Sequence, residues 1–273
     1  MTAEPLIIIV APNGARKTQA DHPSLPILPE EIAQEARRCM DAGASMIHLH
    51  VRDQGQGHSL DVGRYRAAIE AIEDECNGGI LIQATTEAVG MYTAAQQMQM
   101  VRELRPPSVS LAISELVPED GEPAARDFFH DLQDLNILPH YILYSVEDVL
   151  RFEQLRDRGV IPHSPAFLLF VLGRYTAGQQ SHPRDLIPFL NVMNRADIWS
   201  VCAFGPLEHM TASAAIAMGG HVRVGFENNM LLKDGKQALS NAELVCQVSQ
   251  VSDAIGRPVA GVSELKKSVI ICS

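Results

Sequence analysis

The sequence predicts an α/β protein, a (β/α)8 barrel formed by residues 1–273 as one domain. Two observations predict it. Short strand-type runs alternate with helix-type runs eight times, and no linker or repeat interrupts them. Strands separated by helices pair in parallel through right-handed crossovers, and eight such units close into a barrel. An open doubly wound sheet is the alternative, but no G-x-G-x-x-G motif follows the first strand, so a dinucleotide site has no support.

The first four units show the clearest boundaries. Residues 6–11 (LIIIVA) form a short β-branched run that ends at Pro12 and Gly14, which is typical of a buried strand. Residues 29–43 begin with proline and two acids and end at glycine, as helices commonly do. Further strands are expected over 45–51, 80–85 and 108–113, and further helices over 61–75, 93–104 and 123–136.

The last four units continue the pattern. Strands are expected over 140–145, 166–173, 198–205 and 221–228. The matching helices are expected over 146–159, from near Pro183, over an alanine-rich run that ends at Met218-Gly219-Gly220, and over 241–255. Active sites of such barrels lie at the C-terminal ends of the strands, so functional residues are expected there.

Composition narrows the range of functions. The chain has 22 basic and 33 acidic residues, a net charge of −11, which argues against nucleic-acid binding. Its five scattered cysteines contain no C-x-x-C, which indicates reduced thiols and a cytoplasmic setting. No signal-peptide pattern and no apolar run of about 18 residues is found, so no membrane partner is expected.

His48 and His50 lie two positions apart in the second strand, so both point to the same face. At a strand end they would face the barrel mouth as candidate metal ligands, although a pair of hydrogen-bonded core histidines is the alternative. Glu227, just beyond Gly225 of the last strand, is the candidate third ligand, because that strand and the second strand both neighbour the first. Two histidines and one carboxylate form an accepted catalytic zinc set. His221 begins the last strand at the opposite end and is excluded.

Other polar residues at strand ends are further candidates. Arg223 inside the last strand is costly unless paired, so it forms a structural ion pair, binds a carboxylate with its forked guanidinium or orients a catalytic group. Around the mouth, the sequence also places Arg16, Lys17, Thr85, Glu87, Ser110 and Glu115, each of which could bind substrate or be an ordinary loop or strand residue.

Four segments together resemble the β-keto acid cleavage enzymes over nearly the whole chain: HLHVRD, QATTEAVG, GGHVRVGFENN and APNGARKT with ADHPSLP. The resemblance implies a barrel with a divalent metal, usually zinc, held by residues matching His48, His50 and Glu227. It implies a reaction of a β-keto acid with acetyl-CoA that yields acetoacetate and the CoA ester of the remaining fragment. It also implies a homo-oligomer, a tetramer, in which Arg223 helps to position the base.

The chain departs from the family pattern beside the metal ligand. The family often has an aspartate as the base after the glutamate, whereas this chain has Asn228. An amide cannot accept a proton at neutral pH. The candidate bases are therefore Glu87, Glu115 and Asp53. Thr85 and Ser110 keep hydroxyls that the family pattern assigns to substrate contact.

Substrate and CoA contacts are also read from the resemblance. Relatives that act on amino-bearing keto acids have acids at the positions of Arg16 and Ile142, so a neutral or anionic keto acid is expected here, with Arg16 pairing its distal group. Gly173 and Arg174, in a loop that continues to Gly178 and Arg184, are candidates for CoA binding, and a plain surface loop is the alternative.

Two other functions stay open from the sequence. One is a metal-dependent hydrolase or a retro-aldol or retro-Claisen lyase that uses metal-bound water without CoA. The other is a non-catalytic barrel that binds a metabolite, which the amide at Asn228 would favour.

Overall fold

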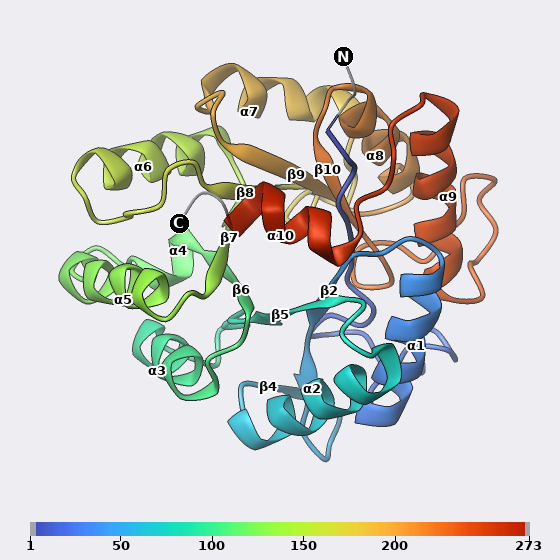
Figure 1. The fold of residues 1–273 in the computed structure, drawn as a ribbon, viewed down its shortest axis with the longest axis horizontal. Helices are drawn as coiled ribbons and strands as arrows, with labels where there is room; N and C mark the ends of the chain where they lie inside the picture. The colour runs from blue at the N-terminus through green and yellow to red at the C-terminus, as the bar shows by residue number, and fades with distance from the viewer. Residues whose placement is uncertain (1–3, 271–273) are drawn as a thin grey trace.

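A computed structural model describes residues 4–270 and shows a closed barrel of parallel strands surrounded by helices (Figure 1). The (β/α)8 fold expected from the alternating pattern is confirmed. Around the barrel the strands follow the order β1 (Ile8–Val10), β10 (His221–Val224), β9 (Ile198–Ala203), β8 (Phe167–Leu172), β7 (Leu138–Leu143), β6 (Ser108–Ala112), β5 (Leu81–Thr85) and β2 (Met46–Leu49).

Helices between consecutive barrel strands form the outer ring, and their first turns follow from local sequence. Pro29 opens the first helix, while Asp61, Thr93 and Ser145 each accept a hydrogen bond from a backbone N–H in the first turn of the helix they precede. The helices are α1 (Pro29–Asp41), α2 (Val62–Cys76), α3 (Ala94–Leu104), α5 (Glu122–Asp134), α6 (Val146–Asp157), α7 (Ile187–Val192), α8 (Glu208–Ala217) and α9 (Asn241–Ala254).

Several short elements were not expected from the sequence. The pair β3 (Val51–Arg52) and β4 (His58–Ser59) forms a small antiparallel sheet after β2. The helix α4 (Ile113–Leu116) follows β6, and a 3-10 turn (Pro183–Leu186) precedes α7. These segments are too short to show a clear period in the sequence.

A further helix, α10 (Val262–Ile270), covers the N-terminal end of the barrel, and Figure 1 shows it lying across the barrel. Leu265 and Val269 pack against an apolar layer inside the barrel, formed by Ile7, Ile9, Met46, Leu81 and Phe167. This end of the barrel is therefore closed by apolar contacts, which leaves the C-terminal strand ends as the open mouth.

The last strand is shorter than expected. It stops at Val224 because Gly225, at φ +139°, turns the chain, and a side chain there would overlap the Ala11 carbonyl. Asn228 N–H then donates to the Gly225 carbonyl at 2.8 Å, which closes a turn. The turn, and not the strand, therefore carries Glu227.

Four of the five cysteines lie within the described residues, and all four are free thiols, as expected; Cys272 lies outside this range. None of the helices between residues 4 and 270 is both long enough and apolar enough to cross a bilayer.

Candidate metal centre at the barrel mouth

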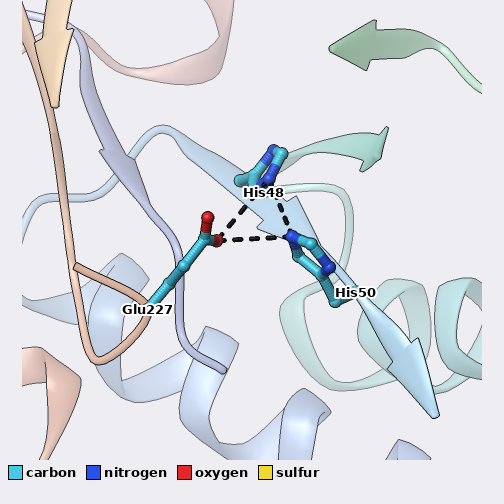
Figure 2. Close-up of side chains that lie close together, drawn as sticks. All are labelled: His48, His50 and Glu227. Carbon is cyan, nitrogen blue, oxygen red and sulfur yellow. Dashed lines mark hydrogen bonds and ion pairs between the residues drawn. The ribbon is translucent and has the colours of Figure 1, made fainter. Parts of the chain in front are cut away.

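His48, His50 and Glu227 converge at the mouth of the barrel (Figure 2). The Nε2 atoms of the two histidines are 3.1 Å apart, and Glu227 Oε2 lies 3.3 Å from His50 Nε2 and 3.7 Å from His48 Nε2. The neighbouring Ile47, Leu49 and Val51 face the helices, as the strand period predicts. One ligand atom from each of the three residues therefore meets at a common point.

The turn that carries Glu227 is held in place from several sides. Lys17 Nζ donates to the carbonyls of Phe226 and Glu227 at 2.6 and 3.1 Å. Phe226 N–H donates to Asn241 Oδ1 at 2.7 Å. Arg223 Nη2 donates to Glu227 Oε1 at 3.0 Å, which leaves Oε2 buried and without a hydrogen-bond partner. A carboxylate oxygen in this state normally has a partner, so its orientation toward two imidazole nitrogens fits a divalent cation.

The two histidines differ in the contacts of their Nδ1 atoms. His48 Nδ1 lies 2.9 Å from Gln83 Oε1, whereas the buried His50 Nδ1 has no hydrogen-bond partner and lies 3.9 Å from Glu87 Oε2. A histidine that binds a metal through one nitrogen usually donates its other N–H to an acceptor. His48 already has this second contact.

Electrostatics favour the metal-binding protonation states. Burial lowers the pKa of His48 well below its ordinary value, and the charge of Arg223 lowers it further. Burial alone would raise the pKa of Glu227, but Arg223 and the histidines outweigh it and hold that pKa well below its ordinary value. At neutral pH the site therefore presents a neutral His48 and an ionised Glu227, the forms that bind a metal.

A narrow hollow opens beside these ligands, and charged groups at one side of it face an apolar wall. Its lining residues are His48, Thr85, Glu87, Ile142, Tyr144, Val171, Arg174, Phe204, Arg223 and Glu227.

At the rim, Glu87 and Arg174 form an ion pair of 3.1 Å, and the Arg174 guanidinium lies 4.9 Å from the Phe204 ring centre. Arg16, which is half-exposed, approaches Glu87 more loosely, at 3.9 Å. Gly173 adopts φ +76° next to the Gln180 backbone, where a side chain would be crowded, so its role in the structure is in the loop conformation.

Of the remaining candidates, Thr85 lines this hollow, whereas Ser110, Glu115 and Asp53 do not. Thr85 Oγ1 accepts from Glu87 N–H at 3.1 Å, and Ser110 Oγ lies 3.5 Å from it. Glu115 accepts from Ala88 N–H at 2.9 Å, and burial raises its pKa. Asp53 is exposed in the β3–β4 turn, where it accepts from the N–H groups of two glycines.

Asn228 lies behind Arg223. Its Oδ1 accepts from Arg223 Nη2 at 3.4 Å, and its Nδ2 donates to Cys202 Sγ at 3.0 Å. Arg223 itself is 3 % exposed and reaches Cys202 Sγ at 3.2 Å. The amide thus orients the arginine that holds Glu227.

Sequence reasoning missed Gln83, Tyr144, Cys202 and Phe204. Gln83 precedes Thr85 by two residues, and Cys202 precedes Phe204 by two, so each pair shares a strand face. Period-2 alternation along the whole of each strand, and not only at its last residue, is the signal that points to Gln83 and Cys202.

A closed barrel whose mouth gathers two histidines, a carboxylate and a buried arginine has the architecture of a (β/α)8 enzyme with a site suited to a divalent cation. The chain belongs to the β-keto acid cleavage enzyme family, whose family model matches residues 5–270. It is an enzyme of the class that transfers acyl groups and cleaves carbon–carbon bonds.

Individual relatives agree with this placement. The chain is 33% identical over 270 residues to the 3-keto-5-aminohexanoate cleavage enzyme of Acetoanaerobium sticklandii, covering 97% of both chains. It is 28% identical over 272 residues to the 3-oxoadipate:acetyl-CoA acetyltransferase of Cupriavidus necator, covering 96% of this chain and 94% of the relative. ObcA in complex with oxaloacetate shares the fold, with a TM-score of 0.73 at 17% identity over 90% of this chain and 67% of ObcA.

Proposed function

We propose that this protein is a metal-dependent enzyme that converts a β-keto acid and acetyl-CoA into acetoacetate and the CoA ester of the remaining fragment. The observation that carries the proposal is the convergence of His48, His50 and Glu227, with the unpartnered Oε2 of Glu227 between the two imidazoles. Relatives named as acetyl-CoA transferases of keto acids support the same reaction class.

These three residues would hold the cation, with zinc as the first choice because it accepts two histidines and one carboxylate. When bound, a divalent cation supplies Lewis acidity toward the keto and carboxylate oxygens of a β-keto acid, which acidifies the carbon between them. Arg223 and Asn228 act behind the ligands: the guanidinium orients the Glu227 carboxylate, and the amide orients the guanidinium.

Glu87 is the best placed proton acceptor. It lines the hollow together with His48, Thr85 and Glu227, and its carboxylate is within reach of a small molecule held there. Arg174 and the Thr85 hydroxyl, which accepts from Glu87 N–H, fix its position. Asn228 cannot accept a proton, and Glu115 does not line the hollow. Thr85 and Ser110 would hydrogen-bond substrate oxygens.

The charges at the rim favour a neutral or anionic substrate over an amino-bearing one. Two arginines, Arg16 and Arg174, face one carboxylate, Glu87, across the rim. An additional carboxylate would complete the pairing of Arg16, whereas an ammonium group would meet an excess of positive charge. Ile142 and Phe204 would contact the apolar part of the keto acid.

Acetyl-CoA would approach over the loop after β8, where Arg174 lines the hollow and Gly173 shapes the loop. A cytoplasmic location is part of the proposal, and the free thiols support it. A homotetramer is part of the proposal and is measured by light scattering of the purified protein.

The test loads purified protein with zinc and offers cationic, neutral and anionic β-keto acids with and without acetyl-CoA, with acetoacetate as the readout. We expect acetoacetate only with acetyl-CoA, and only from neutral or anionic acids. Cleavage without acetyl-CoA would favour a hydrolase or lyase, and metal binding without turnover would favour a metabolite-binding protein. His48→Ala should lose metal and activity together, whereas Glu87→Gln should keep the metal and lose turnover.

A further inference from the structure

A set of polar side chains lies inside the barrel, below His48, where apolar branched residues usually dominate. They come from β5, β6, β7 and β9, and each is fully buried: Gln83, Ser108, His140 and Ser200. Buried polar groups are retained only when they are hydrogen-bonded, and these four bond to one another and to strand carbonyls. The donor and acceptor of each hydrogen bond can therefore be assigned in turn, from Ser200 through His140 and Gln83 to His48.

At the far end, the Leu168 carbonyl can only accept, so Ser200 Oγ donates its single proton to it at 3.1 Å. Ser200 Oγ must then accept from His140 Nε2, at 2.8 Å. His140 is neutral because burial lowers its pKa to about 3, so protonation at Nε2 leaves a lone pair on Nδ1. His140 Nδ1 is therefore an acceptor.

Gln83 connects this acceptor to the metal site. Ser108 Oγ donates to the Leu138 carbonyl at 3.0 Å, so it too must accept from the amide that faces it. Gln83 Nε2 donates to Ser108 Oγ at 3.3 Å and to His140 Nδ1 at 3.2 Å. The two acceptors fix the orientation of the amide, and its Oε1 consequently faces His48 Nδ1 at 2.9 Å.

We infer that the chain from Ser200 through His140 to Gln83 is a positioning relay that holds His48 in the tautomer protonated at Nδ1. Its Nε2 lone pair is thereby directed toward Glu227 and His50, which are the other ligands of the cation in the proposed function, on which this inference rests. Gln83 and His140 are not among the candidate ligands and do not line the hollow, so they would act only through His48.

The first test observes the tautomers directly in metal-free protein by NMR of ¹⁵N-labelled histidine. We expect His48 to carry its proton on Nδ1 and His140 to carry it on Nε2. A proton on His48 Nε2 would overturn the relay. This measurement needs neither metal nor substrate, whereas failure of the unmodified protein to bind zinc would overturn the proposed function instead.

The second test compares zinc affinities by competition with a chromophoric chelator. Gln83→Leu removes the acceptor for His48 and should weaken zinc binding about 10- to 100-fold. Gln83→Glu keeps an acceptor for His48. His140 can turn to its Nδ1-protonated tautomer and donate to the second oxygen, because the Ser200 hydroxyl can turn its proton from the Leu168 carbonyl to His140 Nε2. We therefore expect Gln83→Glu to bind zinc nearly as tightly as the parent.

If Gln83 had only a structural role, Gln83→Glu would weaken zinc binding at least as much as Gln83→Leu, because a buried carboxylate would harm folding at least as much as leucine does. Tyr141→Phe is the matched control. It removes another buried hydrogen bond, the 2.8 Å contact with His163 Nδ1, away from the barrel interior. Zinc affinity should be unchanged in this variant, and an equal loss in Tyr141→Phe and Gln83→Leu would overturn the relay.

Discussion

Gly14 lies against the side chain of the proposed third ligand, and its replacement by alanine would disturb that ligand without altering any charge. Gly14 has φ +64°, and a Cβ atom added there would lie 2.6 Å from Glu227 Cγ and 3.0 Å from Glu227 Cβ. The Gly14 carbonyl accepts from the buried Arg52 at 2.6 and 3.0 Å, so the loop is not free to retreat. The Glu227 side chain must therefore move.

Two effects set the size of the losses in stability and zinc affinity that we expect for Gly14→Ala. An alanine in the left-handed region costs about 1–2 kcal/mol of unfolding free energy. The overlap adds to it, because carbon atoms ordinarily approach to about 3.5–4.0 Å, so the Glu227 side chain must shift by roughly 1 Å. A ligand whose orientation is disturbed binds zinc about 10- to 100-fold more weakly. We expect Gly14→Ala to lose both stability and zinc affinity.

Gly159→Ala is the matched control. Gly159 has φ +66°, and no atom lies within 4 Å of an added Cβ, so this variant carries the backbone strain alone. Urea denaturation of metal-free protein and zinc competition with a chromophoric chelator measure the two quantities separately. Equal stability losses in both variants, with parental zinc affinity in Gly14→Ala, would refute the assignment of Glu227 as a ligand held by this contact.

Three further predictions address other parts of the molecule. Burial raises the pKa of Glu208 to about 8, above its value in the unfolded chain. The folded state therefore binds the proton more tightly, and stability falls as pH rises from about 4.5 toward 8. Glu208→Gln should make the urea midpoint less dependent on pH across this range, and an unchanged pH dependence would contradict the prediction. Arg16→Gln should raise KM for keto acids with a distal carboxylate more than for neutral ones, and equal changes for both would argue against a role for this rim charge in selection. Leu265→Ala, in the face of α10 that closes the N-terminal end of the barrel, should lower the unfolding free energy by about 2–5 kcal/mol in urea titrations while zinc affinity stays parental; a drop in affinity would mean that this end of the barrel supports the site.

The alternation of strands and helices, and the pairing of His48 with His50 on one face, could be read from the sequence because both depend on local periodicity. A strand places alternate side chains on one side wherever it lies, so the histidine pair needs no distant information. The helix starts at Asp61, Thr93 and Ser145 are local in the same sense, because each side chain bonds a backbone N–H within its own first turn.

The geometry at Glu227 was decided only by the tertiary structure. Its turn is held by Lys17, some two hundred residues away in the chain, and its carboxylate is oriented by Arg223, which is itself oriented by Asn228. Gln83 meets His48 through the pairing of β2 with β5, whose register neither strand specifies by itself. Periodicity assigns a side chain to a face, but the direction of its hydrogen bonds depends on partners that only the closed barrel brings within reach.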